Sequence, residues 1–149
     1  MAYVSPMRTS EPQPNPPKAV RPARPRKQAR TGAPKLQLTL RLDVGGQATL
    51  GPGKVRLLEL IGETGSISAA ARVMGMSYRR GWVLVESLNA AFTGPLVSAR
   101  PGGTGGGGAA LLPLGAEVVR LYRTLEQHAA DTGAAELERL QAVLAPPPS

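Results

Sequence analysis

The sequence predicts a mainly α fold with a small β component, and three observations support this. A short alanine-rich helical segment, Ser66–Met74, is followed by a glycine turn and a second, serine-capped helix, which is typical of a helix-turn-helix. Two short apolar strands enclose a glycine-rich stretch directly after that second helix, as in a wing. A last helix begins at Pro113 and carries a stripe of leucines. Together these features predict a winged helix-turn-helix with an N-terminal strand or hairpin and a long C-terminal dimerisation helix.

Residues 1–34 differ in composition from the rest of the chain. They contain eight of the fifteen prolines and the basic run Arg21–Arg30, with few large apolar residues. Such a segment cannot bury enough surface to offset the entropy of ordering, so we expect a disordered basic tail. The tail strengthens DNA binding by releasing counterions, or it is a solubilising extension, or it results from a misassigned start codon. The winged domain is expected at residues 35–131, and a helical extension with a tail at 132–149.

The first elements of the domain are predicted to be two strands and a helix. From Leu36 to Val44, apolar residues alternate with polar ones, which is the pattern of a half-buried strand. A glycine pair at 45–46 can turn the chain so that residues 47–50 pair back. A break rich in glycine and proline then precedes a helix over Lys54–Glu63, which Gly65 would end.

The helix-turn-helix itself is predicted from serines and glycines at the helix ends. Ser66 or Ser68 can cap the first helix, because a serine hydroxyl accepts hydrogen bonds from free N–H groups at a helix start. The alanines of this helix allow close approach to its neighbours, and Gly75 supplies the turn. Ser77 is the expected cap of the second helix, which runs to about Phe92.

The second helix has one apolar face and one face suited to a DNA groove, at about 100° per residue. Its core face comprises Gly81, Leu84, Val85, Leu88 and Phe92. The residues offered to the groove are Ser77, Tyr78, Arg79, Arg80, Trp82 and Val83. An arginine fork can donate two hydrogen bonds to guanine or hold a phosphate, and Val83 can touch a thymine methyl group. Trp82 fits packing beside the core as well as it fits DNA contact.

Leu96–Arg100 and Ala109–Leu112 are predicted to pair as a β-hairpin around glycine-rich residues 101–108. These glycines formally match G-x-G-x-x-G, but the dinucleotide fingerprint requires a helix after it, and here a strand follows. A wing tip along the DNA backbone fits better, and the alternative is a loop without a partner. The remaining candidate DNA contacts are Ser66, Ser68, Arg100 and Thr104.

The last helix is predicted to hold the dimer together. Pro113 suits its first turn, and apolar side chains then recur along one stripe. This stripe and its flank supply the candidate dimerisation residues Leu114, Val118, Leu121, Tyr122 and Leu125. Gly133 would end the helix, and residues 134–144 can form another.

The composition argues against an enzyme, a metal site and a membrane protein. The chain has no cysteine, and its one histidine, His128, falls in the last helix, so neither a catalytic triad nor a metal site can be assigned. We therefore expect no cofactor. No apolar run reaches the about 18 residues that cross a bilayer, so a cytoplasmic, nucleoid-associated protein is expected. The net charge of +8 favours a polyanionic partner, nucleic acid first.

Three segments together resemble the N-terminal domain of the ModE family of molybdate-responsive transcription regulators. They are Gly65–Ala71, Gly75–Arg80 with Trp82, and Gly102–Ala109 ahead of Leu112. The resemblance covers about Leu36 to Asp131 and implies a bacterial, LysR-like winged helix that is a homodimer through residues 114–127. The two half-sites that such a dimer reads on double-stranded DNA would lie about 34–36 Å apart in a near-palindrome.

The chain departs from the family by ending at Ser149, without the molybdate-binding domains that the resemblance implies. No ligand-sensing residue can be carried over, so we expect either another signal or a separate molybdate-sensing protein as a partner. The main hypothesis is a sequence-specific regulator of molybdenum-related genes. The alternatives are a non-specific architectural DNA-binding protein and a winged-helix module that binds another protein.

Overall fold

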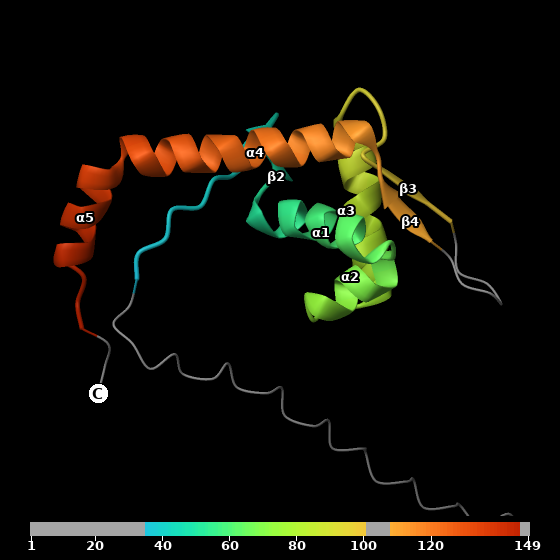
Figure 1. Ribbon diagram of the computed structural model, residues 1–149, viewed down its shortest axis with the longest axis horizontal. Coiled ribbons are helices and arrows are strands. Elements are labelled where there is room, and N and C mark those ends of the chain that lie inside the picture. Colours follow the sequence, from blue (N-terminus) through green and yellow to red (C-terminus); the bar gives the residue numbers. More distant parts are fainter. Residues whose placement is uncertain (1–34, 101–107, 147–149) are drawn as a thin grey trace, which may run out of the picture. The chain divides into compact units, whose positions relative to one another are not determined.

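The computed structural model of the protein describes residues 35–100 and 108–146. Along the chain, its elements are β1 (Leu42–Val44), β2 (Gln47–Leu50), α1 (Pro52–Thr64), α2 (Ile67–Val73), α3 (Tyr78–Ala91), β3 (Val97–Ala99), β4 (Ala109–Leu111), α4 (Pro113–Thr132) and α5 (Ala134–Ala142). β1 pairs with β2 and β3 pairs with β4, both antiparallel (Figure 1). The described part of the chain is therefore mainly α with a small β component, as predicted.

Helix α1 lies at the centre of the hydrophobic core. It contacts α2, α3, α4 and β4, and its predicted apolar face is buried, with Leu57, Leu58 and Ile61 inaccessible to solvent. Each such side chain contributes about 1.5–3 kcal/mol by burial. The helix begins at Pro52. Proline lacks an N–H donor, but the first N–H groups of a helix have no acceptor within the helix, so no hydrogen bond is lost at this position. It ends at Gly65, which adopts the left-handed conformation expected of a helix-ending glycine, with φ of 66°.

Two serines start the next two helices. Ser66 accepts a hydrogen bond from the N–H of Ala69 at 3.1 Å, and Ser77 accepts one from the N–H of Arg80 at 3.2 Å. Ser66 is therefore the cap of α2, which the sequence had left open between two serines. Gly75 turns the chain between α2 and α3 with φ of 68°, a backbone conformation that other residues rarely adopt.

The β3–β4 hairpin follows α3 and is fixed at both edges. The side-chain amide of Asn89, near the end of α3, donates to the carbonyl of Val97 at 2.9 Å. Its oxygen accepts from the N–H groups of Leu96 and Val97 at 2.8 and 3.1 Å. On the other strand, the N–H of Ala109 donates to the carbonyl of Gly65 at 2.9 Å. These bonds tie the hairpin to the end of α1 and to α3.

The strand predicted over Leu36–Val44 is only partly correct. Its last three residues form β1, whereas residues 35–41 have no regular secondary structure. Their backbone groups instead find partners on α4 and α5: the carbonyl of Leu40 accepts from the Tyr122 hydroxyl at 2.6 Å, and the N–H of Leu36 donates to Gln141 Oε1 at 2.6 Å. Leu36 and Leu38 in this segment are each 38% exposed.

Helix α4 packs on α1 and continues past it to α5 (Figure 1). At the start of α4, a Cβ on Gly115 would overlap the carbonyl oxygen of Leu96 and lie 2.6 Å from Leu111 Cδ1, so only glycine fits there. Helix α5 buries none of its residues. No helix in the described residues is long and apolar enough to cross a membrane.

Candidate nucleic-acid interface

Helix α3 turns its predicted outer face to solvent. The buried residues of the helix are Gly81, Val85 and Leu88. On the opposite side, Tyr78 is 44% exposed and Val83 is 55% exposed, and Arg79 and Arg80 are exposed as well. The helical periodicity of the sequence therefore identifies the core face correctly. Of the six predicted groove-facing residues, five are exposed and Trp82 is half-buried.

A recess of about 240 Å³ lies beside α3, where the starts of α2 and α3 meet the base of the β3–β4 hairpin. We call it the hairpin recess. Five predicted DNA-binding residues line it: Ser66, Ser68, Tyr78, Trp82 and Arg100. Gly108 and Ala109 line its hairpin side. Side chains from three separate segments of the chain thus come together at one concave surface.

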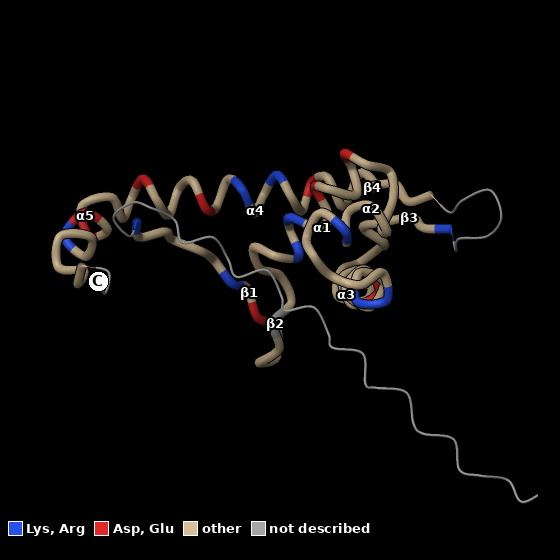
Figure 2. Tube along the Cα trace, turned by 90° about the horizontal axis from the view of Figure 1, so that it is seen from below, with Lys and Arg blue, Asp and Glu red and all other residues tan. Residues whose placement is uncertain are grey.

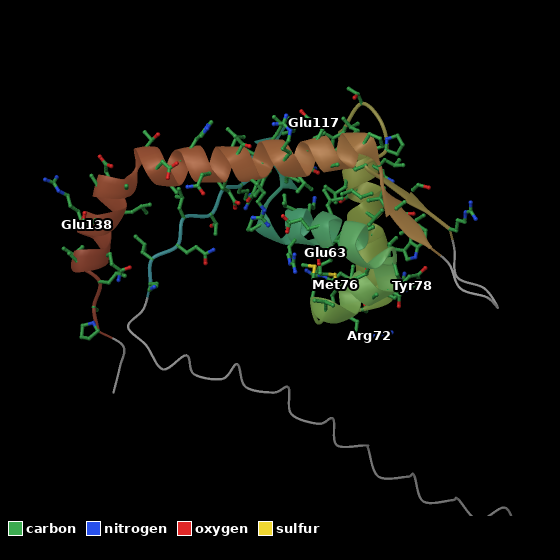
Figure 3. All side chains as sticks on the ribbon, viewed as in Figure 1. Glu63, Arg72, Met76, Tyr78, Glu117 and Glu138 are labelled. Atoms are coloured by element: carbon green, nitrogen blue, oxygen red, sulfur yellow. The ribbon has the colours of Figure 1, made fainter. Side chains whose placement is uncertain are left out.

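The two aromatic residues of α3 pack against each other at the hairpin recess. The rings of Tyr78 and Trp82 meet edge to face, with centroids 6.0 Å apart and planes at 87°. Trp82 also packs against the hydrophobic core, whereas Tyr78 is exposed at the end of the α2–α3 pair remote from α4 (Figure 3). Trp82 therefore contacts both the core and the Tyr78 ring while lining the recess.

The serines at this surface retain hydrogen-bonding capacity. The hydroxyl oxygens of Ser66 and Ser77 accept from backbone N–H groups, which leaves each hydroxyl hydrogen able to donate to an anion. Ser77 also stands at the positive end of the α3 dipole, which favours negative charge nearby. The start of α3 therefore has the chemistry of a phosphate or base-edge contact.

Ion pairing divides the arginines into two groups. On α4, Arg123 binds Glu59 of α1 through Nε–Oε1 and Nη2–Oε2 contacts of 2.7 and 3.0 Å, and this hydrogen-bonded guanidinium lowers the pKa of the Glu59 carboxyl. By contrast, Arg79, Arg80 and Arg100 form no ion pair with any residue that the structure describes. In Figure 2, Lys and Arg segments, drawn in blue, lie on α3 and at the end of β3. Of these three arginines, Arg100 lines the hairpin recess, and Arg79 and Arg80 lie at the start of α3 next to it in sequence.

The predicted dimerisation residues of α4 do not all face outward. Leu121 and Leu125 are each 47% exposed, and Leu114 is partly buried against the core. Val118 and Tyr122 are 8% and 1% exposed, because α1 and the segment 35–41 cover them within the same chain. Their side chains therefore belong to the core rather than to an outer surface.

Thr104, the last of the predicted contacts, lies outside the described residues. Asn89, which anchors β3 to α3, is a residue that sequence reasoning missed. The helical wheel places Asn89 beside the core face, and a polar side chain in that position needs a hydrogen-bond partner. His128 is exposed, and the described residues contain no group of His, Asp or Glu arranged to hold a metal ion.

The chain is similar in sequence to several known proteins. No protein-family model matches the chain. It is 47% identical over 79 residues to the molybdenum-pterin-binding protein MopB of Rhodobacter capsulatus, covering 53% of this chain and 29% of that protein. It is 39% identical over 90 residues to the molybdenum transport protein ModE of Azotobacter vinelandii, covering 60% of this chain and 33% of that protein. The resemblance to the ModE family is confirmed.

A further relative is named for its DNA binding. The chain is 38% identical over 76 residues to the DNA-binding transcriptional dual regulator ModE of Escherichia coli, covering 51% of this chain and 29% of that protein. The chain thus spans about a third of the length of the relatives it matches. These relatives are named as regulators or as molybdenum-binding or transport proteins, and none of these names denotes an enzyme.

Proposed function

We propose that this chain is a transcription regulator that binds double-stranded DNA sequence-specifically through a winged helix-turn-helix formed by residues 35–131. In this reading, α2 and α3 are the helix-turn-helix, α3 is the recognition helix and the β3–β4 hairpin is the wing. The observation that carries the proposal is the start of α3. There Arg79 and Arg80 are exposed without ion pairs in the described structure, next to a serine cap and a recess bordered by the hairpin.

The side chains of α3 match the chemistry of the major groove. An arginine can donate two parallel hydrogen bonds to O6 and N7 of guanine, which discriminates against other bases by about 1–3 kcal/mol. Val83, on the same outer face, offers an apolar contact to a thymine methyl group. Ser66, Ser68, Tyr78 and Arg100 surround the hairpin recess and would hold the phosphate backbone. Thr104, which lies between β3 and β4 in the sequence, would add a further backbone contact.

The regulator is proposed to be a homodimer through the exposed leucines of α4. Leu121 and Leu125 lie on one stripe and remain half-exposed on a helix of 20 residues. An apolar stripe of this kind is stabilised when a second helix covers it. Two recognition helices held in this way would read half-sites about 34–36 Å apart. The names of the relatives make molybdenum-related genes the proposed targets.

Fluorescence anisotropy on a duplex selected by the chain from a random pool, with a shuffled duplex as competitor, tests the DNA-binding proposal. We expect selective binding that survives excess shuffled duplex, and loss of that selectivity in Arg79→Ala with Arg80→Ala. The matched control is Arg72→Ala with Arg139→Ala, which removes the same charge from exposed positions without described ion pairs.

The outcomes separate the proposal from its alternatives. Equal and strongly salt-dependent binding to both duplexes would mean an architectural DNA-binding protein instead. Absence of DNA binding would favour a protein-interaction module. For the dimer, Leu121→Glu with Leu125→Glu should give a folded monomer in analytical ultracentrifugation, and a dimer that persists would place the interface elsewhere.

A further inference from the structure

A second groove of about 300 Å³ lies on the side of α3 opposite to the hairpin recess. We call it the basic groove. Three basic residues from three separate segments line it: Arg41 ahead of β1, Lys54 in the first turn of α1, and Arg80 in the first turn of α3. Its apolar part includes Met74, Met76 and Leu84. Sequence reasoning did not connect Arg41 or Lys54 with binding, because they lie far from α3 in the sequence.

The basic groove carries positive charge and has room at its rim. None of the described residues that line it is an aspartate or glutamate, although Arg41 Nε contacts Asp43 Oδ1 at 2.7 Å. Lys54 donates to the carbonyl of Thr49 at 3.1 Å, which holds its ammonium group at the end of β2. A Cβ built on Gly51 or Gly53, both in the lining, would meet no atom within 4 Å. A polyanion can therefore approach this rim closely.

Helix α3 separates the two recesses. Tyr78 and Trp82 line the hairpin recess, Arg80 and Leu84 line the basic groove, and the outer face with Val83 lies between them. Figure 3 shows Tyr78 and Met76 to either side of this end of the α2–α3 pair. The major groove is about 12 Å wide and is bordered by one phosphate backbone on each side. A helix lying in it would therefore have one backbone beside each recess.

The geometry points to the basic groove as the binding site for the second DNA strand: Arg41 and Lys54 bind its phosphates while the hairpin recess holds the other strand. This inference rests on the proposed DNA-binding function and adds a contact surface to it. The apolar floor of the groove, with Met74 and Met76, would face the carbon atoms of the deoxyribose. Because phosphates carry no sequence information, this surface contributes affinity and orientation but no base selectivity.

The test measures how the DNA affinity of the 149-residue chain depends on salt concentration. Each phosphate contact adds about 0.9 to the slope of log Kobs against log salt concentration. Lys54→Gln and Arg41→Gln should therefore each reduce the magnitude of the slope by about 0.9 on both the selected and the shuffled duplex. The affinity ratio between the two duplexes should stay unchanged. Arg139→Gln on α5 is the matched control, and it should leave the slope as it is.

Phosphate ethylation interference locates the contact. In the wild-type complex, ethylation should interfere on both strands that border the α3 site, and Lys54→Gln should relieve the interference on one strand only. Unchanged slopes and unchanged interference in both variants, while the wild-type chain binds selectively, would overturn this inference and leave the proposed function standing. Absence of DNA binding by the wild-type chain would overturn both. Urea unfolding of each variant separates a lost contact from a lost fold.

Discussion

The hydroxyl group of Tyr122 donates a 2.6 Å hydrogen bond to the carbonyl of Leu40, a residue 82 positions earlier in the sequence. The ring of Tyr122 is 1% exposed, and burial, followed by the nearby charge of Glu126, raises the pKa of its phenol group. This bond holds the segment 35–41 against α4, where no strand pairing is available to it.

Replacing Tyr122 by phenylalanine removes this bond together with the interaction between the hydroxyl group and Glu126. Tyr122→Phe should lower the free energy of unfolding by about 1 kcal/mol, because an intramolecular hydrogen bond contributes about 0.5–1.5 kcal/mol. Hydrogen exchange should accelerate in residues 36–41 but remain slow in the centre of α1. Urea unfolding and exchange measured by mass spectrometry check both results. Equal exchange in the two proteins would mean that the segment is held by its other contacts.

The ion pair between Glu59 and Arg123 should make stability depend on pH in acid. Because Arg123 lowers the pKa of Glu59 below its ordinary value of 4.5, the stabilisation is present above that value and is lost as pH falls through the lowered pKa. At neutral pH, Glu59→Gln should cost about 1 kcal/mol, a modest value because the pair is partly exposed.

The measurement is the free energy of unfolding of wild type and Glu59→Gln between neutral pH and pH values below 4.5. The difference between the two proteins should shrink as the pH falls. Glu117→Gln, which removes the exposed pair with Arg120 inside α4, is the control and should have a smaller effect. A constant difference at all pH values would contradict the assignment of this stability to the Glu59 charge.

Glycine-to-alanine substitutions should have opposite effects in α1 and α4. In a helix this change usually stabilises by up to about 1 kcal/mol. Gly53→Ala should follow that rule or be neutral, because its Cβ would point into open space. Gly115→Ala should instead destabilise by about 1–3 kcal/mol or more, because its Cβ would overlap the Leu96 carbonyl. Thermal unfolding of both variants checks the sign, and a stabilised Gly115→Ala would mean that α4 can shift away from β3.

Asn89 should matter more for stability than its partly exposed position indicates. Asn89→Ala leaves the N–H groups of the buried Leu96 and Val97 without their partner, and each unsatisfied buried group costs about 1–3 kcal/mol. Asn89→Asp keeps the two acceptor bonds but turns a carboxylate oxygen toward the Val97 carbonyl, so it should be intermediate. Urea unfolding of the two variants gives the order, and equal losses would mean that the donated bond dominates.

Local patterns predict the helices and most of the candidate site. The core face of α3 follows from apolar spacing alone, and the cap at Ser77 and the turn at Gly75 follow from residue type. These features depend on neighbours a few residues away, so a single sequence contains them. The same holds for the hairpin, whose strands are marked by the glycines between them.

Features that depend on distant residues were not predictable in this way. The alternation from Leu36 onward indicates extended backbone, but whether that backbone finds a strand partner depends on α4, about 80 residues later. Tyr122 was therefore placed beside a dimer stripe, whereas Leu40 covers it within its own chain. The basic groove escaped prediction for the same reason, because its basic residues come from three separate segments.

The single residue Leu112 separates β4 from α4, and its N–H is fixed to the Leu96 carbonyl at 2.8 Å. With so short a connection, the hairpin and the axis of α4 cannot tilt independently. In the proposed homodimer, a molecule that binds the hairpin better in one tilt than in another would therefore change how well α4 pairs with its mate, and the reverse would hold by the same factor. Occupancy of the hairpin surface and the proposed self-association would then be thermodynamically coupled through one peptide unit, with no separate transmitting element between them.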